Sequence, residues 1–221
     1  MELFDQQIIP LELSLGRTAN LYFWPNWLAE AEADALLAQS IAEIPWRGDT
    51  LLIAGKEIPM PRLHCWYGTS RQQSAQAVAQ ESPYNWSGVS MRSIPFPPWL
   101  DTVRLQVEQQ SGERFNRVLA NYYRDGNDSV DWHSDDEPVL GPAPVIASVS
   151  LGAERVFNFR HRMPGANGKR KRFDLVLPHG SLLVMAPGMQ RYWHHRIAKV
   201  KGITEPRVNF TFRMIQPPQN R

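Results

Sequence analysis

Two short segments of this 221-residue chain carry residue types that could bind a metal ion. In His133-Ser134-Asp135, the imidazole and the carboxylate lie two residues apart, so on an extended backbone they point the same way. A third ligand must come from another histidine, and the candidates are His64, His161, His179, His194 and His195. Adjacent residues on a strand face opposite ways, so only one of His194 and His195 could reach the ion. Two imidazoles and one carboxylate form the facial set of non-haem iron(II) oxygenases, which leaves positions for a cosubstrate and dioxygen.

The stretch from residue 207 to residue 213 alternates strictly between polar and apolar side chains. Its polar face holds Arg207, Asn209, Thr211 and Arg213, and its apolar face holds Val208, Phe210 and Phe212. The polar face would be costly inside a barrel without a partner, and an anionic dicarboxylate fits because arginine grips carboxylates in a bidentate way. Asn121 and Tyr123 form a second same-face pair on an earlier strand. The alternative for each strand is an ordinary solvent-facing polar side.

Short strands separated by turn signals dominate the second half of the chain. The expected strands span 118–123, 145–151, 155–159, 173–177, 182–186 and 207–214. Such strands suggest a barrel or a two-sheet jelly roll. Before them, the pattern predicts a helix from Pro25 to Pro45, a strand at 51–53 followed by a turn, and a helix from Pro98 to Gly112. The chain is therefore expected to be mainly β with flanking helices, an α+β protein.

Length, composition and charge narrow the class of protein. From its length we expect one domain over residues 1–221 first and two small domains second, and 43% hydrophobic residues are enough for a sizeable core. Its net charge of +2 excludes a strongly basic, histone-like protein, and its single cysteine, Cys65, excludes a disulfide framework. It shows neither a signal peptide nor an apolar stretch of membrane-spanning length. We expect no membrane association, a cytoplasmic location (bacterial-type cytosol or nucleoid) and a monomer.

Two charge clusters of opposite sign follow each other in the chain. The stretch 125–137 contains six acids and no Lys or Arg, and the stretch 160–172 contains six Lys or Arg and no acid. Taken singly, each is most simply a solvated loop.

Seven motifs in order give the chain a specific resemblance over residues 50–214. They are Asn121-Tyr-Tyr123-Arg-Asp-Gly, His133-Ser-Asp135-Asp136-Glu137, Ser148-Val-Ser-Leu-Gly152, Phe157-Asn-Phe-Arg160-His, His179-Gly-Ser-Leu-Leu, Trp193-His-His195 and Arg207-Val-Asn-Phe-Thr-Phe-Arg213. The chain resembles the AlkB-type iron(II)- and 2-oxoglutarate-dependent dioxygenases, with closest similarity to the DNA-repair members. The resemblance implies a double-stranded β-helix (jelly-roll) core over 117–214. It also implies an N-terminal extension over 1–116 that carries helices and a nucleotide-recognition lid.

The resemblance also implies a role for each matching residue. His133, Asp135 and His195 match the Fe(II) ligands and so the catalytic centre. The 2-oxoglutarate positions are matched by Asn121, Tyr123, Arg207, Asn209, Thr211 and Arg213. The substrate positions are matched by Tyr84, Trp86, Asp136, Glu137, Arg160 and Arg162, with Arg62 as a further phosphate contact. The implied reaction uses dioxygen to demethylate 1-methyladenine or 3-methylcytosine in single-stranded or duplex DNA, with RNA as an open alternative. It releases formaldehyde, succinate and CO2.

One position departs from the pattern of the duplex-active relatives. Where they carry an aromatic wedge that replaces the flipped base, this chain has Ala54, whose methyl group cannot fill the gap. We therefore expect a preference for single strands or RNA. Other functions remain open from the residues. They are a 2-oxoglutarate-dependent hydroxylase of a protein or small molecule, a catalytically silent nucleic-acid-binding module, and a zinc hydrolase.

Overall fold

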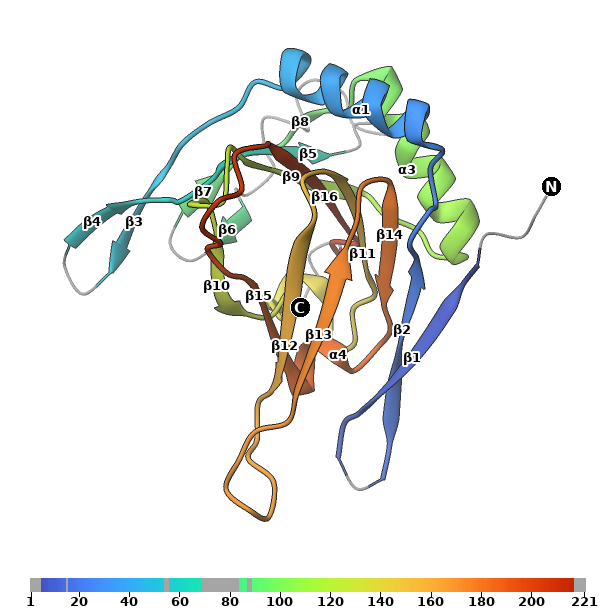
Figure 1. Ribbon diagram of the computed structural model, residues 1–221, viewed down its shortest axis with the longest axis vertical. Coiled ribbons are helices and arrows are strands. Elements are labelled where there is room, and N and C mark those ends of the chain that lie inside the picture. The colour runs from blue at the N-terminus through green and yellow to red at the C-terminus, as the bar shows by residue number, and fades with distance from the viewer. Residues whose placement is uncertain (1–4, 15, 54–55, 69–83, 87–88, 217–221) are drawn as a thin grey trace, which may run out of the picture.

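The computed structural model describes residues 5–14, 16–53, 56–68, 84–86 and 89–216. Two sheets facing each other form the core, as the predicted jelly roll requires (Figure 1). The large sheet contains, in spatial order, β1 (Gln7–Glu12), β2 (Thr18–Trp24), β14 (Ser181–Met185), β11 (Ile146–Gly152), β16 (Arg207–Arg213), β9 (Arg117–Tyr123), β5 (Leu63–Gly68) and β8 (Ile94–Pro95). The small sheet contains β10 (Val130–His133), β15 (Trp193–Ile197), β12 (Arg155–His161) and β13 (Arg172–Leu177).

The helices and two hairpins lie around these sheets. They are α1 (Glu30–Glu43), α3 (Pro98–Ser111), α4 (Met189–Tyr192), a 3-10 turn η1 (Pro138–Leu140), the hairpin β3 (Thr50–Ile53) with β4 (Lys56–Pro59), and the hairpin β6 (Tyr84–Trp86) with β7 (Val89–Met91). Helix α3 begins at Pro98, as predicted, and Gly112 ends it in the left-handed conformation (φ 73°). Helix α1 begins five residues after the predicted Pro25. None of the helices among the described residues is long and apolar enough to cross a membrane.

The two faces of the large sheet bury different cores. One core lies between the sheets and includes Leu119, Ile146 and Phe159. The other lies between the outer face and helices α1 and α3, where Phe210 and Phe212 are fully buried. Each buried side chain of this size contributes about 1.5–3 kcal/mol. The apolar face of the last strand thus packs outward against a second layer, as its alternation predicts.

The large sheet crosses the expected boundary at residue 117. Strand β2 pairs with β14, and β5 pairs with β9, so segments on both sides of that boundary belong to one sheet. The strand predicted at 51–53 forms part of β3, which pairs with β4 in a hairpin that projects from the body of the molecule (Figure 1), and the turn predicted after residue 53 falls on residues outside the described part of the chain. Ala54, the position of the missing wedge, lies outside the described residues.

Candidate functional site

The three predicted metal ligands meet where two strands of the small sheet pair. In the antiparallel register of β10 and β15, His133 lies directly opposite His195, and their rings are 4.4 Å apart in an edge-on arrangement. Asp135 follows β10 by two residues. The candidate ligand atoms of the three side chains all lie within 4.8 Å of one another, which suits a single ion.

The register of β15 decides between the two adjacent histidines. Its side chains alternate, so Trp193, His195 and Ile197 are buried while His194 and Arg196 are partly exposed on the opposite face. Only His195 of the adjacent pair lines the pocket that His133 and Asp135 also line. The structure therefore places His195, and not His194, beside the other two ligands.

Neighbouring groups fix the orientation of the ligand atoms. His133 donates its Nδ1 hydrogen to the carbonyl of Asp131 at 2.7 Å, which leaves Nε2 as the metal-binding nitrogen. Arg213 Nη2 donates to Asp135 Oδ1 at 2.6 Å, and the other carboxylate oxygen lies 4.0 Å from His195 Nε2. A metal-binding lone pair is thus presented by each side chain, so the donor set fits a divalent ion.

The protonation states also suit a metal ion. Burial, and after it the neighbouring His133, lowers the pKa of His195 to about 3. Burial alone would raise the pKa of the Asp135 carboxyl, but Arg213 together with His195 and His133 holds the pKa below its ordinary value. At neutral pH the histidine is neutral and the aspartate ionised, which are the forms that bind metal.

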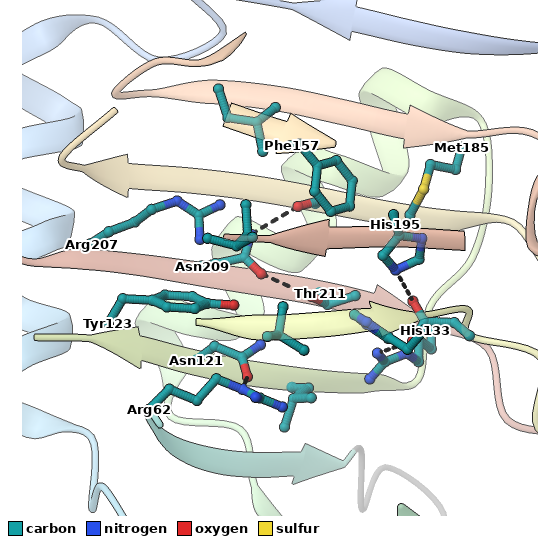
Figure 2. Close-up of a pocket in the computed structure, with 17 residues that line it drawn as sticks. Arg62, Asn121, Tyr123, His133, Phe157, Met185, His195, Arg207, Asn209 and Thr211 are labelled. Atoms are coloured by element: carbon teal, nitrogen blue, oxygen red, sulfur yellow. Dashed lines mark hydrogen bonds and ion pairs between the residues drawn. The ribbon is translucent and has the colours of Figure 1, made fainter. Parts of the chain in front are cut away.

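A pocket extends from this cluster along the inner face of the large sheet. Its polar lining includes all six residues matched to 2-oxoglutarate together with Arg62 and Ser148, and its apolar lining is Leu119, Val130, Phe157, Leu177, Met185 and Ile197. Figure 2 shows His133 and His195 at one end of the pocket and Tyr123 and Arg207 at the other. The structure thus brings together the metal cluster and the guanidinium-bearing strand.

Arg207 lies at the far end of the pocket, and part of its guanidinium has no hydrogen-bond acceptor. Its side chain is buried (2% exposed), and Nη2 donates to Ser150 Oγ at 2.9 Å, whereas Nε and Nη1 have no hydrogen-bond acceptor. Burial lowers its pKa to about 10, despite the opposing effect of Tyr123, so the group remains cationic at neutral pH. A buried cation with two unused N–H groups fits a carboxylate ligand.

The remaining polar residues of the pocket are held by one another. Asn209 Nδ2 donates to Ser148 Oγ at 2.8 Å and to the Val149 carbonyl at 2.9 Å, and Thr211 donates to Asn209 Oδ1 at 2.9 Å. Asn209 is therefore engaged within the protein. We did not predict Ser148 as a site residue, although it lines the pocket. It lies on β11 two residues before Ser150, and therefore on the same face of that strand.

Arg62 corrects the sequence interpretation. We predicted a further phosphate contact, but the side chain is only 4% exposed and lines the pocket, where its Nε donates to Asn121 Oδ1 at 2.9 Å. The residue precedes β5, a strand that we did not predict. Without that strand, nothing in the sequence indicated which way Arg62 points.

The residues matched to substrate binding lie around and outside the pocket. Asp136, next to the ligand Asp135, is exposed and forms an ion pair with Arg162 at 2.7 Å. Glu137 is partly buried, and Arg160 lies 4.3 Å from the ring centre of Trp132. Tyr84 and Trp86 form strand β6, but their side chains lie outside the described part of the chain.

Comparison with known proteins shows which family the chain belongs to. The sequence profile of the 2OG-Fe(II) oxygenase superfamily matches residues 20–213. Alpha-ketoglutarate-dependent dioxygenase alkB homolog 3 is 39% identical to this chain in both Mus musculus and Homo sapiens, over 93% of this chain and 70% of each relative. DNA oxidative demethylase ALKBH2 of Mus musculus is 42% identical over 69% of this chain and 64% of that protein.

A solved structure supports the fold independently of sequence. The structure of OsALKBH1 superposes with a TM-score of 0.55 at 16% identity, over 94% of this chain and 100% of that chain. At this identity the likeness concerns the jelly-roll fold alone. The sequence profile and the relatives show that the chain belongs to the AlkB-type branch of the iron(II)- and 2-oxoglutarate-dependent dioxygenases.

Proposed function

We propose that this dioxygenase removes N-alkyl groups from bases of the 1-methyladenine and 3-methylcytosine type in DNA, with RNA as a second polymer. The observation that carries the proposal is a buried pocket with a three-ligand cluster at one end and the buried Arg207 guanidinium, only partly satisfied by the protein, at the other. The names of the relatives, which include DNA oxidative demethylase, support nucleic acid as the substrate. The products are the repaired base, formaldehyde, succinate and CO2.

His133, Asp135 and His195 would hold Fe(II), and Arg207 would bind the distal carboxylate of 2-oxoglutarate. Iron and 2-oxoglutarate, when bound, supply with dioxygen the oxidising power that hydroxylates the N-methyl carbon, which then leaves as formaldehyde. Arg213 keeps the Asp135 carboxylate ionised and turned toward His195. The apolar walls around Phe157 and Met185 exclude water and limit unproductive oxidation.

The other polar residues would shape the cosubstrate end of the pocket. Tyr123 lies beside Arg207, whose guanidinium carbon is 5.1 Å from the centre of its ring. Asn121 accepts a hydrogen bond from Arg62, so its amide nitrogen is directed toward other acceptors. Asn209 positions Thr211 and Ser148 at the pocket wall, and its own polar atoms are already occupied.

Charge around the pocket favours a cationic base on a polyanionic chain. Asp136 and Glu137 follow the metal ligand and would stabilise a methylated base that carries a positive charge. Stacking on Trp86 would add a cation–π contribution. Arg160, Arg162 and the basic stretch up to residue 172 would contact phosphates, which gives an affinity that falls with salt.

The test is a formaldehyde-release assay on oligonucleotides that carry 3-methylcytosine or 1-methyladenine. We expect release from the wild-type protein only with Fe(II) and 2-oxoglutarate, and none from Asp135→Ala. Release that persists in Asp135→Ala would refute the ligand assignment. If 2-oxoglutarate is turned over but no methylated oligonucleotide stimulates it or yields formaldehyde, the substrate is instead a protein or a small molecule.

The strand preference is tested separately by filling the wedge position. Single strands and RNA avoid most of the cost of unpairing a base, and Ala54 offers little to replace a flipped base in a duplex. We expect Ala54→Phe to raise activity on duplex DNA several-fold relative to activity on the matching single strand. Ala54→Leu serves as a control for apolar bulk without an aromatic face. An unchanged ratio in Ala54→Phe would remove the basis for the preference.

A further inference from the structure

Gln190 lies between the two chain segments that carry the metal ligands. It belongs to the short helix α4, five residues before His195, and its side chain is 1% exposed. No motif in the sequence marks this residue. A neutral polar side chain buried this completely needs hydrogen-bond partners, so the identity of those partners indicates the role of the residue.

The two polar atoms of the Gln190 amide have different partners. The backbone N–H of Asp135 donates to Gln190 Oε1 at 3.0 Å, and Gln190 Nε2 donates to the sulfur of Met185 at 3.4 Å. A backbone N–H can only donate, so the amide oxygen must face Asp135, and the orientation of the amide is fixed. Met185 lines the pocket beside His195 (Figure 2), so the amide bridges the ligand segment and the pocket wall.

Asp135 is consequently held at two points. Arg213 fixes one carboxylate oxygen, whereas Gln190 fixes the backbone from which that carboxylate extends. We propose that Gln190 is a positioning residue that sets the place of the Asp135 ligand and thereby the affinity of the site for its metal. The inference concerns the metal site, and it stands whether or not nucleic acid is the substrate.

The same helix also connects the site to the outer surface. The carbonyl of Gln190 accepts a hydrogen bond from Arg162 Nη1 at 3.4 Å, and that nitrogen also pairs with Asp136 at 2.7 Å. Gln190 is therefore linked to residue 135 through its side chain and to residue 136 through its carbonyl by way of Arg162. The backbone of the metal ligand Asp135 is thus positioned by α4 as well as by β10.

The experiment measures Mn(II) binding to the metal-free protein by electron paramagnetic resonance, without any turnover. Gln190→Met keeps the length and bulk of the side chain but replaces the amide oxygen by a thioether sulfur, which is a much weaker acceptor for the Asp135 N–H. We expect it to weaken Mn(II) binding about tenfold, the scale on which groups that orient metal ligands act. The Co(II)-loaded variant should also show an altered visible spectrum, because the carboxylate is displaced.

Met189→Val is the matched control, since Met189 is buried in the same helix and contributes to the inter-sheet core. We expect it to lower thermal stability and leave Mn(II) affinity unchanged. If Gln190→Met does not fold, Met185→Leu removes the other partner of the amide and should weaken binding by a smaller factor. Wild-type Mn(II) affinity in Gln190→Met, or an equal loss in Met189→Val, would overturn the proposal.

Discussion

The two ends of the pocket are prepared for their ligands in opposite ways. At the metal end, the Asp135 carboxylate already has a cation in Arg213, and His133 has a backbone acceptor. At the other end, the Arg207 guanidinium is buried with two N–H groups that have no acceptor. The metal end is thus oriented in advance by the protein, whereas the cosubstrate end keeps a buried cation whose remaining donors suit a carboxylate.

The largest expected effect comes from breaking the preparation of the metal end. Arg213→Met leaves the Asp135 carboxylate buried without its cation, and removing one partner of a buried pair typically costs about 3–5 kcal/mol. We expect the free energy of unfolding of the metal-free protein, measured in urea, to fall by about this amount. Adding Asp135→Asn to Arg213→Met is the control, because the double variant should recover part of the loss. Strict additivity would show that the pair is not coupled.

At the cosubstrate end, the same kind of substitution should have the opposite effect on stability. Arg207→Met removes a buried cation with unused donors, so the metal-free protein should be as stable as the wild type or more stable. Loss of hydrogen bonds to a carboxylate should raise the KM for 2-oxoglutarate about 100-fold, or about 2.7 kcal/mol. Steady-state kinetics and thermal unfolding of one preparation test both statements. A destabilised variant with an unchanged KM would contradict the contrast between the two ends.

The pH dependence of stability should report on the metal end. Because burial holds the pKa of His195 at about 3, the unfolded chain takes up a proton near pH 6.5 that the folded chain refuses. The stabilisation that results from this difference in pKa is fully present above pH 6.5. It is lost as the pH falls toward 3, and the free energy of unfolding then decreases by up to about 1.4 kcal/mol per pH unit. Urea unfolding of metal-free wild type and His195→Leu between pH 7 and 4.5 should show a shallower slope in the variant. Parallel curves would rule out this linkage.

The smallest effect is expected for the pocket residues whose polar atoms already form hydrogen bonds with other residues of the protein. Thr211→Val keeps the shape of the side chain but leaves the buried Asn209 Oδ1 without its donor. We expect a loss of about 1 kcal/mol in stability and a change of a few-fold in the KM for 2-oxoglutarate. The control is Thr102→Val on the exposed side of α3, which should change neither quantity. A change in KM as large as that of Arg207→Met would mean that Thr211 binds the cosubstrate directly.

The sequence predicted those features that depend on periodicity and on residue type. Strict alternation placed Arg207 and Arg213 on one face of the last strand, and the structure confirms that both line the pocket. Capping residues gave the bounds of α3. The spacing of His133 and Asp135 was sufficient to propose a shared ion.

Features that depend on long-range register could not be predicted from local patterns. The residues alone left His194 and His195 open, and only the resemblance indicated His195; the pairing of β15 with β10 gives the physical reason for that choice. Strand β5 was missed because its residues are buried continuously and do not alternate. Without that strand, the orientation of the buried Arg62 could not be predicted either. Gln190 carries no local signal, because its partner Asp135 lies in a distant part of the chain.

The pairing of His133 with His195 has a consequence for the lifetime of the protein. The complete ligand set exists only in chains whose small sheet has formed, so the ion binds the native state in preference to the unfolded state. Free metal at 100 times its dissociation constant adds about 2.7 kcal/mol to stability by mass action. Under iron starvation the polypeptide should become more susceptible to proteolysis, so its abundance as well as its catalytic rate would follow the iron supply.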